Sequence, residues 1–300
     1  MSDEPAIRLQ EVTKSYGRHT AVDQLSLEVP RGAVYGFIGP NGSGKTTTLR
    51  VIMHILLPDS GNVEVLGKTG TRAANDSIGY LPEERGLYKK MTVRQQLAYY
   101  TALKGIPAAE ARIEIDAWLK RLELTEWADY KVEALSKGMM QKIQFISTVV
   151  SKPELVILDE PFAGLDPVNV EVMRSAILKL RENGATVVLS THDMQIASEM
   201  CDFVLMMHKG KKVLDGTLDS IREKYGADTI RIAVNGGKTE LLEMKGVSLV
   251  RDLGRLQEIR VEGSPRDFLH TLSGKIEISH FEIVTPSLHD IFLRIAGPDA

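Results

Sequence analysis

The sequence predicts an α/β domain built on a parallel sheet, followed by a smaller α+β domain. Short apolar segments, such as residues 155–158 and 186–191, have the composition of strands buried inside parallel sheets. Segments with helical periodicity alternate with them, which is typical of a sheet covered by helices on both faces. After about residue 225 the order becomes strand–helix–strand–strand–helix–strand, which indicates a ferredoxin-like, split βαβ domain.

The first part of the chain contains three predicted strands and a helix. Residues 7–12 and 22–29 alternate apolar and polar side chains, as half-buried strands do. Residues 31–39 form an apolar segment that ends in glycine, which indicates a buried strand entering a turn. Residues 45–58 follow as a helix, which Pro58 is expected to end.

A helical insert is predicted over about residues 83–150. Thr92 and Gln95 have the spacing of a capping box and open one helix. Residues 108–122 form a second helix, with apolar side chains at helical spacing. Residues 135–141, "LSKGMMQ", read as the start of an amphipathic helix.

The remaining elements complete the two predicted domains, residues 1–225 and 226–300. A strand at 154–161, a helix at 168–182 and a strand at 186–191 belong to the first domain. The second domain has predicted strands at 228–234, 246–252, 256–262 and 277–284, and predicted helices near 238–244, 264–272 and 287–295.

Composition excludes several classes of protein. The 37 basic and 40 acidic residues give a net charge of −3, which argues against nucleic-acid binding through bulk charge. The single cysteine permits no intrachain disulfide and fits a reducing, cytosolic setting. No apolar run approaches the roughly 20 residues of a membrane span, and "MSDEP" at the start is not a secretory signal. We therefore expect the chain to serve a membrane, if it does so, by docking onto a partner.

A phosphate-binding loop is predicted between the strand at 31–39 and the helix that follows it. "GPNGSGKTT" satisfies the pattern G-x-x-x-x-G-K-[ST] in the strand–loop–helix context that the pattern requires. Its glycines let the backbone wrap around phosphate oxygens, Lys45 is placed to reach the β- and γ-phosphates, and the Thr46 hydroxyl to ligate Mg²⁺. The nucleotide-binding residues are thus expected to be Gly39, Pro40, Asn41, Gly42, Ser43, Gly44, Lys45, Thr46 and Thr47.

Two carboxylates lie near the end of the predicted strand at 154–161. Asp159 ends "LVILD", and a carboxylate at a strand end beside a phosphate loop commonly holds Mg²⁺. Glu160 comes next, where it is placed to orient and polarise an attacking water. We therefore predict Asp159 as a metal ligand and Glu160 as a general base.

The order of five motifs resembles the ATPase subunits of ABC transporters, over roughly residues 6–222. The motifs are the phosphate loop, "LSKGM", "LVILDEP", "GLD" and "STHD". Many phosphate-loop enzymes have the first and third, whereas "LSKGM" just upstream of "LVILDEP" is specific to this family. The resemblance implies a P-loop NTPase core of the ABC ATPase type, with the insert as its helical signature subdomain and with ATP and Mg²⁺ as cofactors.

The resemblance also implies roles for residues whose spacing alone indicates no function. Tyr16 would stack on adenine, and His192 would be the switch histidine that contacts the γ-phosphate. Ser136, Lys137 and Gly138 would form a signature that acts in trans on the ATP of a second cassette. Asp166 would be the D-loop aspartate that communicates across that dimer.

The chain departs from the family pattern at two places. Glu83 stands where the family usually has glutamine, and we expect it to contact the metal only through the outer sphere, since a carboxylate near ATP is repelled unless Mg²⁺ or water lies between. In the signature, Lys137 and Met139 replace a glycine and a glutamine. The wording "YLPEERGLY" and a C-terminal extension like 226–300 resemble the branch that serves bacterial exporters of sodium ions, drugs or lipids.

The expected function is therefore to hydrolyse ATP and power a membrane exporter. The expected partners are a second copy or a paralogous cassette, paired head to tail, and a polytopic membrane permease that holds the chain at the cytoplasmic face of the membrane. Residues 83–104, including Leu87, Tyr88, Tyr99 and Tyr100, would form the groove for the permease, although core packing is the favoured role for Tyr99 and Tyr100.

The alternative is a soluble ABC-type ATPase that acts on ribosomes or nucleic acid. Such proteins usually carry two cassettes or a long coiled coil between the motifs. Here 114 positions separate Lys45 from Asp159 (159 − 45), and there are no sustained heptads and no basic tail. No nucleic-acid partner is expected.

Overall fold

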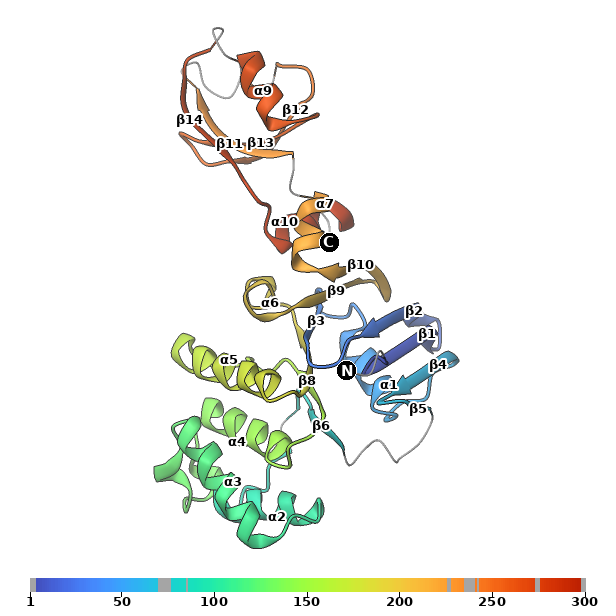
Figure 1. Ribbon diagram of the computed structural model, residues 1–300, viewed down its shortest axis with the longest axis vertical. Helices are drawn as coiled ribbons and strands as arrows, with labels where there is room; N and C mark the ends of the chain where they lie inside the picture. The colour runs from blue at the N-terminus through green and yellow to red at the C-terminus, as the bar shows by residue number, and fades with distance from the viewer. Residues whose placement is uncertain are drawn as a thin grey trace. The chain divides into compact units, whose positions relative to one another are not determined.

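The computed structural model describes residues 4–69, 77–84, 86–225, 228–234, 241, 243–272 and 276–297. The chain forms two compact units, Met1–Asp215 and Gly216–Ala300, and Figure 1 traces both. Within the described ranges, no helix combines the length and the hydropathy needed to cross a bilayer. Each unit is described by itself.

A four-stranded antiparallel sheet begins the first unit, with strand order β2-β1-β4-β5. The alternating segments at 7–12 and 22–29 form its two long strands. In their hairpin Tyr16 pairs with His19 across a two-residue turn. The strands are β1 (Ile7–Tyr16), β2 (His19–Val29), β4 (Ser60–Val65) and β5 (Lys68–Thr69).

The second sheet has six strands in the order β10-β9-β3-β8-β7-β6. The pairs from β9 to β6 are parallel, as the apolar segments predicted, and β3, β7 and β8 are buried along their whole length. The loops after these strands therefore emerge at one edge of the sheet. The strands are β3 (Val34–Ile38), β6 (Ile78–Leu81), β7 (Leu155–Asp159), β8 (Thr186–Thr191), β9 (Phe203–His208) and β10 (Lys211–Thr217).

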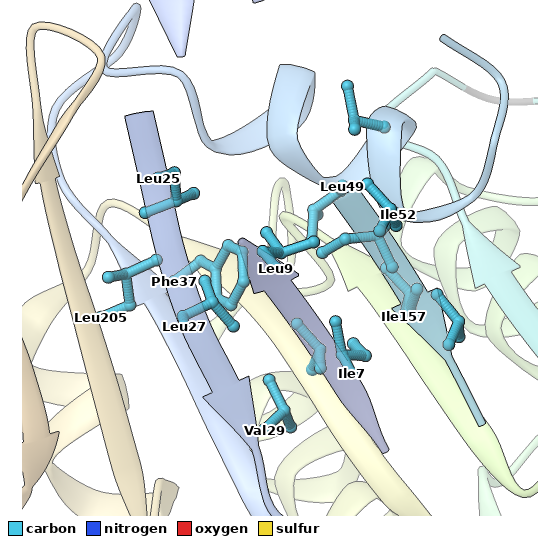
Figure 2. Close-up of a cluster of buried hydrophobic side chains, with 14 of the residues drawn as sticks. Ile7, Leu9, Leu25, Leu27, Val29, Phe37, Leu49, Ile52, Ile157 and Leu205 are labelled. Atoms are coloured by element: carbon cyan, nitrogen blue, oxygen red, sulfur yellow. The ribbon is translucent and has the colours of Figure 1, made fainter. Parts of the chain in front are cut away.

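The main apolar core lies between the two sheets, and α1 (Lys45–Ile52) lies within it (Figure 2). Leu9 and Leu27 come from the antiparallel sheet, Phe37 and Ile157 from the parallel one, and Leu49 from the helix. All five are nearly or fully buried. This packing holds α1 against both sheets and so fixes the position of its N-terminus.

Helix α1 ends six residues before Pro58, earlier than predicted. The amide of His54 donates to Val51 O and the amide of Ile55 to Arg50 O, and His54 has a φ of 53°. This is a Schellman ending built without the glycine that usually marks one. The sequence therefore placed the end of this helix too late in the chain.

Helices α4 (Lys137–Val149), α5 (Pro167–Glu182) and α6 (Met194–Met200) cover the other face of the parallel sheet (Figure 1). Helices α2 and α3 pack on α4 and form a helical subdomain with it. The Thr92–Gln95 capping box is present at the start of α2, and Lys142 of α4 donates to Leu122 O at the end of α3. The helices are α2 (Val93–Leu103), α3 (Ala108–Arg121), α4 (Lys137–Val149), α5 (Pro167–Glu182) and α6 (Met194–Met200), with short 3₁₀ turns at Thr125–Trp127 and Val132–Ala134.

The second unit is a four-stranded antiparallel sheet with order β12-β13-β11-β14, the ferredoxin-like order that the sequence predicted. Its core includes Ile230, Ile259 and Leu272. The described elements are β11 (Thr229–Val234), β12 (Val247–Asp252), β13 (Gln257–Val261), β14 (Ile278–Ile283), α7 (Leu218–Tyr225), α9 (Pro265–Leu272) and α10 (Leu288–Ala296).

Two details of the second unit bear on the predictions. It begins at Gly216, ten residues before the expected boundary (226 − 216), and so includes α7, which the sequence assigned to the first domain. Most of the helix expected near 238–244 lies outside the described residues.

Candidate nucleotide-binding site

A cavity of about 470 Å³ opens where β3, β7 and β8 end. Its wall gathers segments that are far apart in the sequence, from the β1–β2 hairpin to the loop after β8. Of the residues expected to form a site, those that line it are Tyr16, Asn41, Gly42, Gly44, Lys45, Thr46, Thr47, Glu83, Glu160 and His192.

The loop between β3 and α1 requires glycine at two positions. Gly39 and Gly44 have φ values of 145° and 105°, which side chains rarely adopt. A Cβ atom on Gly39 would lie 2.3 Å from Met207 O, and one on Gly44 would lie 2.2 Å from Ala21 O. The loop is therefore pressed against β2 and β9, and no other residue fits there.

The N-terminus of α1 faces the cavity. Its N-cap is Gly44, so no side chain caps the helix, and no acidic residue lies in the first turn. Lys45, Thr46 and Thr47 of that turn all line the cavity. The uncapped amides and the positive end of the helix dipole make this point suited to an anion such as phosphate.

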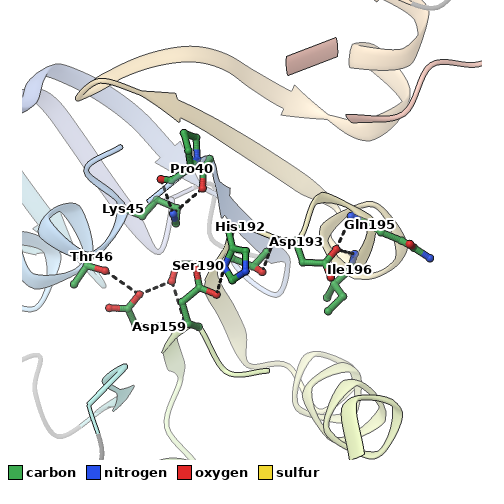
Figure 3. Close-up of polar contacts among 12 residues, drawn as sticks. Pro40, Lys45, Thr46, Asp159, Ser190, His192, Asp193, Gln195 and Ile196 are labelled. Atoms are coloured by element: carbon green, nitrogen blue, oxygen red, sulfur yellow. Dashed lines mark hydrogen bonds and ion pairs between the residues drawn. The ribbon is translucent and has the colours of Figure 1, made fainter. Parts of the chain in front are cut away.

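Lys45 is a buried cation, 6% exposed. Its Nζ donates to Gly39 O at 2.7 Å and to Pro40 O at 3.1 Å (Figure 3). Burial lowers the pKa of Lys45, and the carboxylates of Glu160, Asp159 and Glu83 oppose that shift. Those carboxylates therefore favour the charged form of Lys45 beside the loop.

Asp159 is fully buried, yet only one of its carboxylate oxygens is satisfied within the described part of the chain. Thr46 Oγ1 donates to Oδ1 at 3.2 Å, and the Ser190 hydroxyl donates to the same atom (Figure 3). Oδ2 has no hydrogen-bond partner among the described residues. A buried carboxylate with an unpartnered oxygen, beside a hydroxyl, fits a hard divalent cation such as Mg²⁺.

Glu160 and His192 lie together at the cavity wall. His192 Nδ1 is 3.0 Å from Glu160 Oε2. Glu160 has a φ of 49°, and its amide donates to both Ser190 O and Ser190 Oγ. β8 thus holds a strained backbone that presents this carboxylate to the cavity.

The loop that carries His192 is fixed by its neighbours. The amide of Asp193 donates to Thr191 Oγ1, and the Asp193 side chain caps α6 by accepting from the amides of Gln195 and Ile196 (Figure 3). His192 therefore lies in a turn whose conformation these hydrogen bonds fix.

Three lining residues, His19, Ala21 and Ala163, were missed from the sequence. Of these, His19 pairs with Tyr16, which is 49% exposed and also lines the cavity. The signal was the two-residue spacing between them, because a tight hairpin turn brings the flanking residues opposite each other.

The signature and D-loop residues do not line this cavity. Ser136 caps α4, accepting a hydrogen bond from the Met139 amide at 3.2 Å. Asp166 caps α5, accepting from the amide and the side chain of Asn169, and these bonds hold the pKa of Asp166 below its usual value. Other expected residues outside the lining are Lys137, Gly138, Gly39, Pro40, Ser43 and Asp159.

Comparisons with known proteins agree with this arrangement. Residues 22–163 match the family model described as "ABC transporter", and residues 216–296 match "ATP-binding protein DrrA1-3-like, C-terminal domain". The uncharacterized ABC transporter ATP-binding protein YhaQ of Bacillus subtilis is 41% identical over 293 residues, covering 97% of this chain and 98% of that protein.

A second relative and a solved structure point the same way. The Nod factor export ATP-binding protein I of Sinorhizobium fredii is 32% identical, over 97% of this chain and 86% of that protein. A structure described as the ATP binding subunit of an ABC transporter superposes with a TM-score of 0.69 at 28% identity, covering 74% of this chain and 93% of that one. The phosphate-loop fold and the resemblance drawn from the motifs are thereby confirmed. The chain belongs to the ATP-binding proteins of the ABC transporter family, which bind ATP and hydrolyse it to power transport.

Proposed function

We propose that this protein is the ATP-hydrolysing subunit of a membrane exporter and that its cavity holds ATP with the phosphates on residues 39–47. The observation that carries this is the convergence of Lys45, Glu160 and His192 on one cavity, with Asp159 bonded to Thr46 beside it. These groups come from three separate segments, the start of α1, the end of β7 and the loop after β8, and ATP hydrolysis gives each of them a use.

The nucleotide is bound by charge at one end and by stacking at the other. Lys45 and the N-terminus of α1 take the β- and γ-phosphates, since both present positive charge to the cavity. The half-exposed ring of Tyr16 stacks on adenine, and His19 lies beside it.

Thr46 Oγ1 and Asp159 Oδ2 are the protein ligands for Mg²⁺. Oδ2 supports this assignment because it is buried without a partner among the described residues. When bound, Mg²⁺ supplies positive charge that offsets the charge on the phosphate oxygens.

Glu160 acts as the general base. It orients a water and accepts its proton while the water oxygen bonds to the γ-phosphorus and the bond to the bridging oxygen of ADP breaks. His192, 3.0 Å from Glu160 Oε2, fixes the carboxylate and contacts the γ-phosphate.

The dimer is the second part of the proposal. Ser136, Lys137, Gly138 and Asp166 lie outside the cavity of their own chain, so they serve the cavity of a partner cassette, a second copy or a paralogue, arranged head to tail. The Ser136 hydroxyl and the N-terminus of α4 then meet the γ-phosphate from the opposite side. ATP binding favours the dimer, and hydrolysis releases it.

A groove of about 430 Å³ between β6, α2 and α4 suits a helix of a polytopic permease. It is lined in part by Leu87, Tyr100 and Leu103, the last of them 64% exposed. Tyr88 and Tyr99, in edge-to-face contact at 5.7 Å, are exposed on the same segments. Exposure of Tyr99 favours docking over core packing for that side chain, and docking would hold the protein at the cytoplasmic face of the membrane.

Export is the direction of transport that the relatives favour. The C-terminal unit matches the DrrA1-3-like domain, and a relative at 32% identity is named for Nod factor export.

Phosphate release by wild type, Lys45→Ala and Glu160→Gln tests the site. Both variants should lose at least about 100-fold in turnover, while Glu160→Gln still binds ATP. Glu182→Gln, an exposed carboxylate at the end of α5, is the matched control and should hydrolyse normally. Normal turnover by Glu160→Gln would exclude it as the base.

Purification from solubilised membranes tests the partner. Recovery of a stoichiometric polytopic membrane protein supports the exporter assignment, and recovery of ribosomes or nucleic acid in its place would establish the soluble alternative.

A further inference from the structure

Glu83 is a carboxylate of the cavity wall that does not come from the ends of β7 and β8. It follows β6 and lines the same cavity as Lys45, Thr46 and Glu160. Its neighbour Glu84 does not line that cavity. Two successive glutamates therefore differ in whether their charge faces the nucleotide.

The backbone around Glu83 is held in place from inside the protein. Gln144 of α4 is 6% exposed, and its Nε2 donates to Pro82 O at 3.3 Å and to Glu84 O at 3.1 Å. These carbonyls belong to the residues on either side of Glu83. A buried amide thus fixes the main chain at the point where the carboxylate enters the cavity wall.

Negative charge exceeds positive charge at this end of the cavity. Glu83 and Glu160 line it, and Asp159 lies beside it with Oδ2 unpartnered among the described residues. Lys45 is the cation they face, and its Nζ is already turned onto two loop carbonyls. A ligand that enters therefore meets two lining carboxylates, with a third buried beside the cavity, and one ammonium group.

This excess distinguishes two forms of the same nucleotide. Free ATP carries roughly four negative charges at neutral pH, and its complex with a divalent cation about two, so a fixed carboxylate repels the free anion about twice as strongly. The Asp159 Oδ2 oxygen, unpartnered within the described ranges, attracts only the form that brings a cation.

We propose that Glu83 makes nucleotide entry depend on the divalent cation: the cavity admits the cation–ATP complex and disfavours the free triphosphate. The inference rests on the proposed function, in which Lys45 and the N-terminus of α1 hold the phosphates. Glu83 acts here through its charge and needs no direct bond to the metal.

The test is the affinity for a fluorescent N-methylanthraniloyl derivative of ATP, titrated once with excess MgCl₂ and once with EDTA. The quantity compared is the Kd measured in EDTA divided by the Kd measured in MgCl₂. A larger ratio means stronger selection for the metal complex. Glu83→Gln should lower that ratio about tenfold, chiefly by tightening the binding of free nucleotide. Raised salt should shrink the effect, because screening weakens it.

Glu84→Gln is the matched control, since it removes the same charge one residue away and outside the cavity lining. It should leave the ratio as in wild type, and Glu83→Asp, which keeps the charge, should retain most of the selection. An unchanged ratio in Glu83→Gln overturns the inference, as does loss of Mg–ATP binding, which would make Glu83 a required contact. Wild type that binds the probe in neither condition would instead refute the proposed phosphate site itself.

Discussion

At the scale of single residues, the role proposed for Glu160 conflicts with stability. It adopts a φ of 49°, a left-handed conformation that disfavours a glutamate side chain, directly after the buried strand β7. Two hydrogen bonds from its amide to Ser190 hold it there. The conformation points the carboxylate at the cavity and at His192.

Glu160→Gly should therefore raise stability while it abolishes hydrolysis. Glycine adopts positive φ without strain, which we expect to add about 1 kcal/mol to the free energy of unfolding. Thermal unfolding followed by circular dichroism measures this, with a rise in Tm of roughly 2–4 °C.

Glu171→Gly is the control for that experiment. Glu171 is an exposed glutamate within α5, where glycine should cost about 1 kcal/mol because it loosens a helix. Equal destabilisation by both substitutions would show that the backbone at Glu160 is not strained.

Cys201 is the only thiol, and it is buried next to Gly36. Burial raises the pKa of Cys201, and the neighbouring Asp202 adds to the shift, so little thiolate exists at neutral pH.

Iodoacetamide should consequently label the native protein far more slowly than the urea-unfolded protein, by at least about 100-fold. Mass spectrometry of the alkylated chain gives the rate. Rapid stoichiometric labelling under native conditions would contradict the buried position.

Sequence reasoning reached most of the residues at the cavity but not their conformations. Lys45 and Glu160 were predicted because their spacing from strands is visible in the sequence, whereas His192 was named only through the family resemblance. The surroundings of Asp159 and the strain at Glu160 depend on Ser190 and Thr46, which meet these carboxylates only in the fold. His19 was missed for a related reason, since its position depends on the hairpin that turns it toward Tyr16.

At the scale of elements, α4 links the signature to both acidic loops. Its first residue follows the Ser136 cap. One turn further, the buried Gln141 donates from Nε2 to Pro161 O at 3.1 Å, next to Glu160. A further turn on, Gln144 holds the segment of Glu83. A movement of the helix start would therefore reach both carboxylates through side-chain amides.

Gln141→Leu should slow turnover more than it weakens ATP binding. The change keeps the bulk of the side chain and leaves Pro161 O without its donor, so the loop of Glu160 loses its anchor while the phosphate loop is untouched. Steady-state kinetics should show kcat lowered roughly 5- to 20-fold, with KM for ATP changed less than about twofold.

The control is Gln195→Leu, which removes an exposed amide that bonds Glu199 on α6. It should leave kcat unchanged. A rise in KM with normal kcat in Gln141→Leu would mean that the amide serves binding and not the positioning of Glu160.

Elements were predicted well where the pattern was local. The capping box at Thr92 and the apolar strands β7 and β8 follow from neighbouring residues alone. The end of α1 was misjudged because His54 takes a left-handed conformation that is rare for any residue but glycine or asparagine. In the six-stranded sheet the order of the strands could not be predicted, since it depends on long-range pairing such as that of β3 with β8 and β9.

At the scale of the whole molecule, the chain contains the cavity proposed to hold the nucleotide and a set of motif residues that lie outside its lining. Ser136 and Asp166 cap their own helices and line no part of that cavity. The proposed dimer explains both facts, because the same residues would complete the cavity of a partner. The second unit begins at Gly216 and includes α7, which the sequence assigned to the first domain. Arg294 of α10 donates to Tyr225 O at the end of α7, a contact between segments far apart in the sequence that local patterns do not show.

Static light scattering of Glu160→Gln, with and without ATP, tests the dimer directly. Because this variant should bind ATP without consuming it, its mass should double when ATP is added. Adding Ser136→Arg should keep nucleotide binding and abolish the doubling, since a bulky cation at the start of α4 blocks the interface. A protein that remains monomeric while saturated with ATP, or that still doubles with Ser136→Arg, would contradict the shared site.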